Sequence, residues 1–81
     1  MFYTRYSIVM TPTTLSQYVK GMRKQYRLTQ EDLAEKAGVG LRFVRDLEQG
    51  KTTLRMDKVN QVLSLFGAEL APVKQVYNEE S

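Results

Sequence analysis

The sequence predicts a mainly α fold, a compact domain of four to five helices with a short β-strand at each end. Two observations carry this prediction. Apolar residues recur at helical spacing through the middle of the 81-residue chain, whereas both flanks have strand-like patterns. The chain therefore divides into a strand or arm at residues 1–11, a helical domain at 12–67, a second strand at 68–77 and a disordered tail at 78–81.

The N-terminal flank alternates between two sets of residues, and this period of two is typical of a half-buried strand. One set is Phe2, Thr4, Tyr6, Ile8 and Met10, and the other is Tyr3, Arg5, Ser7 and Val9. Pro12 ends the pattern. Because a short strand is not stable alone, it needs a partner from the other end of the chain or from the same segment across a twofold axis.

The first helix should run from Thr13 or Thr14 to Gln25, because apolar residues repeat there at helical spacing. They are expected to face the core and are Leu15, Tyr18, Val19, Met22 and Tyr26.

Two further helices are predicted between Leu28 and Lys51, on either side of one tight turn. Thr29 should cap the first by accepting a hydrogen bond from the amide of Asp32. Gly38 follows where a helix commonly ends in a left-handed residue, a conformation that glycine adopts at little cost.

The second of these helices should end at Gly50, with Val44 and Leu47 three residues apart on its inner face. Leu41, Arg42 and Arg45 are then expected to point outward. Two short helices around a tight turn are the framework of a helix-turn-helix, which lays its second helix along the DNA major groove.

A fourth helix should begin near Arg55 and end before Gly67, with one apolar side that roofs the core and can reach a second subunit. That side carries Met56, Val59, Val62, Leu63 and Phe66. The strand expected from Ala68 to Tyr77 contains Pro72, which restricts it to a sheet edge or to the start of a pairing.

The central residues resemble the pattern of the Cro/C1-type helix-turn-helix family, also called the XRE family, over roughly Leu15 to Phe66. The matching elements are Leu28-Thr29-Gln30, Leu33-Ala34, Gly38-Val39, Val44 and Leu47-Glu48-Gln49-Gly50-Lys51. The resemblance implies a lambda-repressor-like bundle of about five helices, although this chain supplies four and then a strand-like segment.

Within that family the chain is similar to the HipB-type antitoxins, through residues 44–51, residues 59–66 and the Gly67-Ala68-Glu69-Leu70 segment. This likeness implies C-terminal strands that pair between the subunits of a homodimer, and a toxin partner that is a HipA-like serine/threonine kinase. It also implies autorepression of the operon through a palindromic operator in double-stranded DNA. The N-terminal strand departs from that group.

On the expected recognition helix, Arg42 and Arg45 share a face, and arginine fits guanine O6 and N7 with two hydrogen bonds. Leu41 and Phe43 are candidates to contact thymine methyl groups. The alternatives are exposed ion pairs of Arg42 with Asp46 or Arg45 with Glu48, and burial of Phe43 against a neighbouring helix.

Candidate phosphate contacts flank this helix. Thr29 and the amides around it offer donors at a helix N-terminus. The family likeness implies phosphate contacts for Gln30 and Lys51, and it also implies that Gln30 braces the recognition helix. Gly40 and Arg55 complete the set. Any of these could instead be merely solvated.

Three further predictions concern structure and assembly. Arg23 and Glu48 align with family positions that form a partly buried ion pair, so both are taken as structural. A core this small is commonly marginal unless a second subunit adds to it. The dimer interface is expected at Val62, Phe66, Leu70 and Val73.

Composition limits the function classes. The chain has a net charge of +3 and no cysteine or histidine, which argues against a metal site, a cofactor or an enzyme. Ten basic and six acidic residues lie between Lys20 and Lys58, so the positive charge is concentrated on the helical module. Without an apolar span or a signal peptide, the protein is expected in the cytoplasm. A stand-alone or phage-type repressor and a protein-interaction module remain the alternatives.

Overall fold

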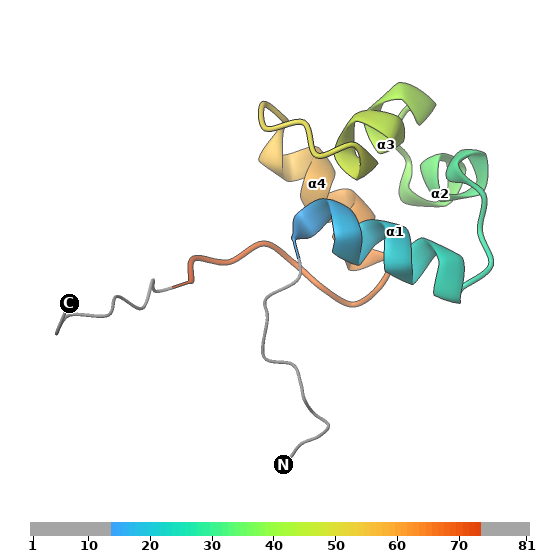
Figure 1. The fold of residues 1–81 in the computed structure, drawn as a ribbon, viewed down its shortest axis with the longest axis horizontal. Coiled ribbons are helices and arrows are strands. Elements are labelled where there is room, and N and C mark those ends of the chain that lie inside the picture. Colours follow the sequence, from blue (N-terminus) through green and yellow to red (C-terminus); the bar gives the residue numbers. More distant parts are fainter. Residues whose placement is uncertain (1–13, 74–81) are drawn as a thin grey trace, which may run out of the picture.

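The structure, a computed structural model, describes residues 14–73 and contains four helices in this range (Figure 1). They are α1 (Leu15–Gln25), α2 (Gln30–Ala37), α3 (Leu41–Glu48) and α4 (Met56–Ser64). This confirms the mainly α, four-helix prediction. The expected strand at residues 2–10, the end of the expected C-terminal strand and the expected disordered tail lie outside the described residues.

The first two helices begin where the sequence predicts because local side chains satisfy their free amides. At α1, Thr14 accepts a hydrogen bond from the amide of Gln17, whose side chain accepts one from the Thr14 amide. Thr29 and Asp32 form the same reciprocal capping box at α2. Each box satisfies two backbone amides with side-chain acceptors only three residues away.

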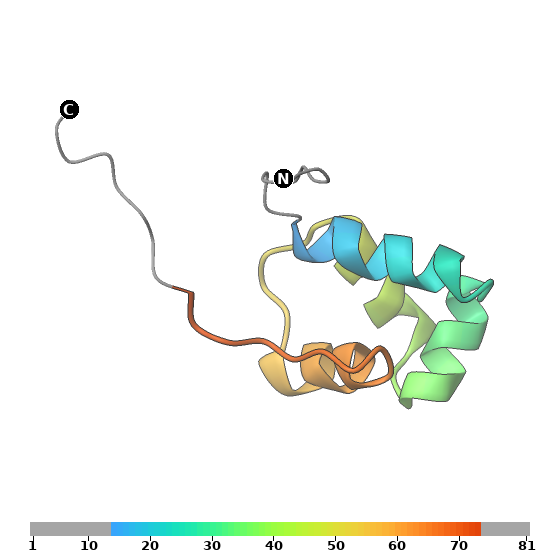
Figure 2. The same ribbon diagram turned by 90° about the horizontal axis from the view of Figure 1, so that it is seen from below.

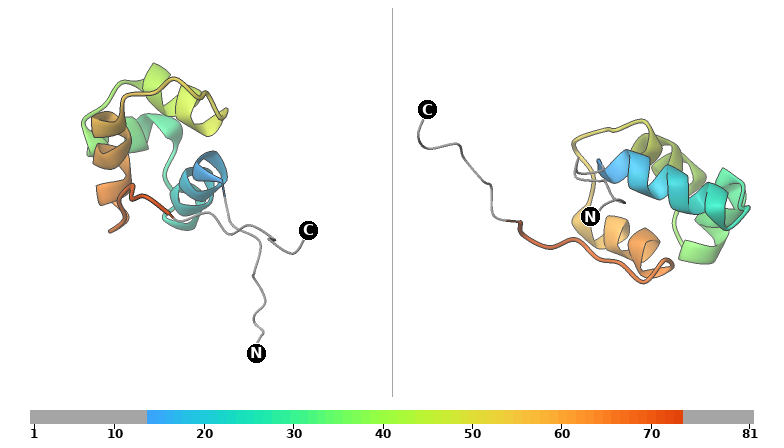
Figure 3. Two further views of the ribbon diagram at one scale, coloured as in Figure 1. Left: turned by 90° about the vertical axis from the view of Figure 1, so that its left-hand side faces the viewer. Right: turned by 60° about the horizontal axis from the view of Figure 1, so that its bottom comes forward.

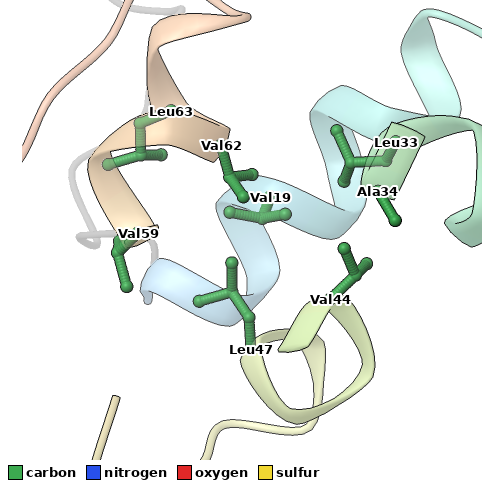
Figure 4. Close-up of a cluster of buried hydrophobic side chains, with 8 residues drawn as sticks. All are labelled: Val19, Leu33, Ala34, Val44, Leu47, Val59, Val62 and Leu63. Atoms are coloured by element: carbon green, nitrogen blue, oxygen red, sulfur yellow. The ribbon is translucent and has the colours of Figure 1, made fainter. Parts of the chain in front are cut away.

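The four helices enclose one apolar core, to which every helix contributes (Figure 4). α1 and α4 lie on opposite sides of it, while α2 and α3 close the end between them (Figure 2). Most of the core was predicted by the helical spacing, and its buried members are Val19, Leu33, Ala34, Val44, Leu47, Val59, Val62 and Leu63. The inward orientation expected for Tyr26 and Met56 is wrong, because each lies at a helix end, past the last or before the first turn that packs on the core, and they are 54% and 67% exposed. None of the four helices has the length and apolarity needed to cross a bilayer.

After α4 the chain turns at Gly67, where φ is +74°, and residues 68–73 run back along the helix as a drawn-out segment (Figure 3). The amide of Ala68 donates to the carbonyl of Leu63, and the amide of Leu70 donates to Asn60 Oδ1 at 2.7 Å. Residues 68–73 form no strand within the single chain. A strand that pairs with a second subunit at this position stays a prediction.

Candidate nucleic-acid interface

The turn between α2 and α3 fixes the angle at which α3 leaves the core. Gly38 ends α2 with φ +76°, in the left-handed region that glycine adopts at a lower energetic cost than other residues. The amide of Val39 donates to the carbonyl of Ala34, and its side chain packs against the core. Gly40 then begins α3 in an extended conformation, without a side-chain cap.

Inside α3, residues at helical spacing separate a buried face from an exposed one. Val44, Leu47 and Glu48 are buried, whereas Arg42 and Arg45 are exposed. Because the buried face fixes the rotation of the helix, both arginines are directed at solvent. Among the described residues, no side-chain hydrogen bond or ion pair engages Arg45.

The outward orientation expected for Leu41 is wrong in part. Its side chain is half-buried and packs against the core, because Leu41 lies three residues before Val44 on the same side of the helix. Phe43 is also half-buried and contacts the core, four residues before Leu47. Only part of each side chain is therefore open to a ligand.

Arg42 reaches along α3 to Asp46, with Nε 3.3 Å from Oδ1, while 87% of the arginine side chain stays exposed. Lys51 Nζ lies 3.6 Å from Oδ2 of the same carboxylate. Asp46 thus pairs with two of the expected DNA contacts at once. Helical spacing predicts Asp46 only as a partner of Arg42, because its link to Lys51 depends on the turn after α3.

The other end of α3 is held by a network centred on Glu48, whose side chain is only 2% exposed. Arg23 of α1 donates to this carboxylate through Nε at 2.7 Å and Nη2 at 3.1 Å, and through Nη1 to the carbonyl of Leu28. Gln30 of α2 donates to Glu48 Oε1 at 3.1 Å. The structure therefore brings the expected pair together and adds Gln30 to it.

The candidate phosphate contacts differ in how free their side chains are. Thr29 is exposed, although its hydroxyl already accepts from the Asp32 amide, and Gln30 is half-buried against Glu48. Lys51 and Arg55 are exposed cations, each beside a carboxylate. Gly40 is exposed, and a Cβ added there would meet nothing within 4 Å.

Two carboxylates near the motif are stabilised in their ionised form. Hydrogen bonds from Thr29, its backbone amide first, hold the pKa of Asp32 below its usual value. The guanidinium of Arg55 does the same for the pKa of Asp57, by a side-chain hydrogen bond of 2.7 Å. Both acids therefore keep their charge at neutral pH beside the expected DNA surface.

Gln61 is a positioning residue that the sequence pattern does not predict. Its Nε2 donates from α4 to the carbonyls of Ala37 and Gly38, at 3.2 and 3.4 Å, where α2 ends. These carbonyls have no partner inside α2, so the bond fastens the recognition turn to α4. A lone glutamine on the polar side of a predicted helix carries no signal for this role.

The residues expected at a dimer interface have unequal access to a partner. Val62 is wrong for this role, because its side chain is 0% exposed within the core of the single chain. Phe66 and Leu70 are half-buried, and Phe66 stacks at a tilt against Tyr26 with ring centroids 5.5 Å apart. Val73 is 85% exposed.

Comparison with known proteins agrees with this geometry. A family described as "Helix-turn-helix" matches residues 19–73, which include all of α2, α3 and α4. The chain is also 45% identical over 62 residues to a protein of Sinorhizobium fredii (strain NBRC 101917 / NGR234) named "Uncharacterized HTH-type transcriptional regulator y4mF". The aligned region covers 76% of this chain and 82% of that relative. The chain therefore belongs to the helix-turn-helix family, in its Cro/C1 or XRE form.

Proposed function

We propose that this protein is a transcriptional regulator that reads its DNA site with α3. The observation that carries the proposal is the exposure of Arg42 and Arg45 on a helix whose opposite face is fixed in the core. A rigid helix that presents arginines can hold them at guanine edges in the major groove. The name of the Sinorhizobium relative, a transcriptional regulator, agrees with this role.

The neighbouring residues then have distinct roles. The open parts of Leu41 and Phe43 can contact thymine methyl groups, whereas Lys51, Arg55, Thr29, Gln30 and the Gly40 backbone face phosphates. Gln30 has its amide nitrogen on Glu48 and therefore also positions α3.

We further propose a homodimer on a palindromic operator. Two copies of α3 about 34 Å apart would enter successive major grooves of one DNA face. Phe66, Leu70 and Val73 remain the candidates for the contact between subunits, since each has surface open to a partner.

The finer proposal is that the protein is the antitoxin of a type II toxin–antitoxin system, with a HipA-like serine/threonine kinase as its toxin. It is supported by the HipB-like sequence of residues 44–51, 59–66 and 67–70. Such an antitoxin represses its own operon and binds its toxin through a surface separate from α3. A stand-alone repressor is the alternative, because it needs the same α3 and no toxin.

Base reading is tested by substitutions that separate shape from charge. Arg42→Ala or Arg45→Ala should each cost about 1–3 kcal/mol of binding and relax the preference at one base pair. Arg42→Lys keeps the charge but loses the two-pronged fit, so it should still relax the preference. An equal loss across all sequences, restored by lysine, would show that these residues only neutralise phosphate.

Lys51→Ala provides the comparison for a phosphate contact. It should weaken binding to every DNA sequence similarly and reduce the slope of log affinity against log salt by about one.

The antitoxin proposal is tested by co-purifying the protein with the product of the adjacent gene and titrating the complex against the upstream promoter. A stable complex with a kinase-like protein that binds this DNA supports the antitoxin. Promoter binding without any partner supports the stand-alone repressor, and failure of both preparations to bind DNA specifically contradicts the regulator itself.

A further inference from the structure

An apolar groove of about 430 Å³ lies between the start of α1 and the segment that follows α4. Leu15 and Tyr18 form one wall, Leu63 of α4 lies in it, and Leu70 and Val73 form part of the other wall. We propose that this chain's own N-terminal segment, residues 2–10, covers the groove as a β-strand added to residues 69–73.

The point at which the chain enters the domain favours this occupant. Thr14 caps α1, and the next residue, Leu15, lines the groove. Four residue steps from Met10 to Thr14 span at most about 14 Å even when fully extended. The end of the alternating segment is therefore held close to the groove by the covalent chain.

The backbone of residues 69–73 offers an edge to which a strand can add. The Leu70 amide is bonded to Asn60 on α4, and in an extended segment the next amide on that same side belongs to residue 72. Residue 72 is a proline, so the amide it lacks is on the α4 side. By the same alternation the amides of Glu69, Ala71 and Val73 should point to the other side, and within residues 14–73 no backbone acceptor is found for them. Unpaired edge amides of this kind accept an added strand.

The side chains of residues 2–10 fit the groove in composition. One face of the alternating pattern carries Phe2, Thr4, Tyr6, Ile8 and Met10, of which only Thr4 is small and polar, and the other carries Tyr3, Arg5, Ser7 and Val9. The first face can bury its side chains against Leu15, Tyr18 and Leu70, while Arg5 and Ser7 stay in water.

A second copy of the chain is the competing occupant, and tethering disfavours it. A segment joined by a short linker has an effective concentration in the millimolar range, above that of free chains in solution. If the segment covers the groove, a dimer would contact the added strand together with Val73. This inference does not depend on DNA reading by α3, but it narrows the proposed dimer contact, because the added strand would cover Leu70 and leave Phe66 and Val73 open to a second subunit.

The experiment uses the full chain, labelled for NMR. We expect slow hydrogen exchange at the amides of Glu69, Ala71 and Val73, and nuclear Overhauser contacts from the Ile8 methyls to Tyr18 or Leu70. A mixture of labelled and unlabelled chains separates contacts within one chain from contacts between chains. Contacts only between chains, or free exchange at all three amides, would overturn the proposal.

A pair of variants tests which face of the segment is buried. Tyr6→Asp with Ile8→Asp should speed exchange at the three amides by at least about tenfold, because the strand detaches. The matched control, Ser7→Asp with Val9→Asp, adds the same two charges on the other face and should leave exchange slow. Amides inside α1–α4 report that the domain stays folded in both variants, and equal effects of the two variants would contradict the proposed facing.

Discussion

Replacement of Arg23 by alanine tests whether the Glu48 network holds the recognition helix. The Glu48 side chain is 2% exposed and would keep only the hydrogen bond from Gln30, so its charge would stay buried with little compensation. Loss of one partner of such a pair costs about 3–5 kcal/mol of the free energy of unfolding. For a domain of this size, with a stability of about 4–12 kcal/mol, that is a quarter of the total or more.

The size of this effect follows from burial, and the chain offers a matched comparison. Arg42 and Asp46 also form an arginine–carboxylate pair on α3, but 87% of the Arg42 side chain is exposed. Arg42→Ala should therefore change the stability by at most about 0.5 kcal/mol. Because each kcal/mol shifts the melting temperature of such a small domain by about 4–8 °C, Arg23→Ala should melt at least about 12 °C lower.

The assay is thermal and urea unfolding of Arg23→Ala, Glu48→Ala and the double variant, followed by circular dichroism. The double variant should lose less than the sum of the single losses, because removing both charges leaves no unpaired one. Arg23→Met with Glu48→Leu should approach the stability of the original protein. Additive losses, or an Arg23→Ala loss no larger than that of Arg42→Ala, would refute the reasoning.

Three further predictions follow from single residues. Gly38→Ala should destabilise the protein by about 1–2 kcal/mol in urea unfolding, because φ is +76° there. The new Cβ would lie 3.6 Å from Gln61 Nε2, which is an ordinary van der Waals distance. A much larger loss of stability would indicate a steric clash instead of backbone strain. Asp46→Asn should strengthen binding to all DNA and steepen its salt dependence, because it releases Arg42 and Lys51 and removes a negative charge. A filter-binding assay at two salt concentrations measures both effects. Weaker binding of the variant would show instead that Asp46 orients Arg42 for reading bases. Hydrogen bonds from Thr29 lower the pKa of Asp32 in the folded state. The stability that they supply is therefore present above about pH 4 and is lost as the pH falls through the folded pKa. Asp32→Asn should remove this part of the pH dependence, and a pH profile of the melting temperature that the substitution leaves unchanged would contradict the prediction.

Helix positions and the core could be predicted from the sequence because their signals are local. The Thr14 and Thr29 side chains cap amides three residues away. The spacing of Val44 and Leu47 indicates the buried face of α3. Leu41 was harder to place, since it lies at the border of that face, and its burial is decided by how closely the helices pack.

Contacts between distant elements could not be predicted from spacing. Arg23 and Glu48 were paired only through the family likeness, and nothing local in the sequence links Gln61 to the end of α2. The same reason explains the error at Val62: a helix position that is apolar can face the core or a second subunit, and the sequence pattern is identical in both cases.

The Glu48 network also sets the smallest fragment that can keep α3 in its DNA-reading orientation. The capping box of α2 joins residues three apart and can form in a short peptide, but the bonds to Glu48 join residues 18 and 25 positions apart. An excised peptide of α2, the turn and α3 keeps Gln30 but loses both bonds from Arg23. Although the motif has two helices, the smallest unit that keeps all three hydrogen bonds to Glu48 has three, because two of them come from α1.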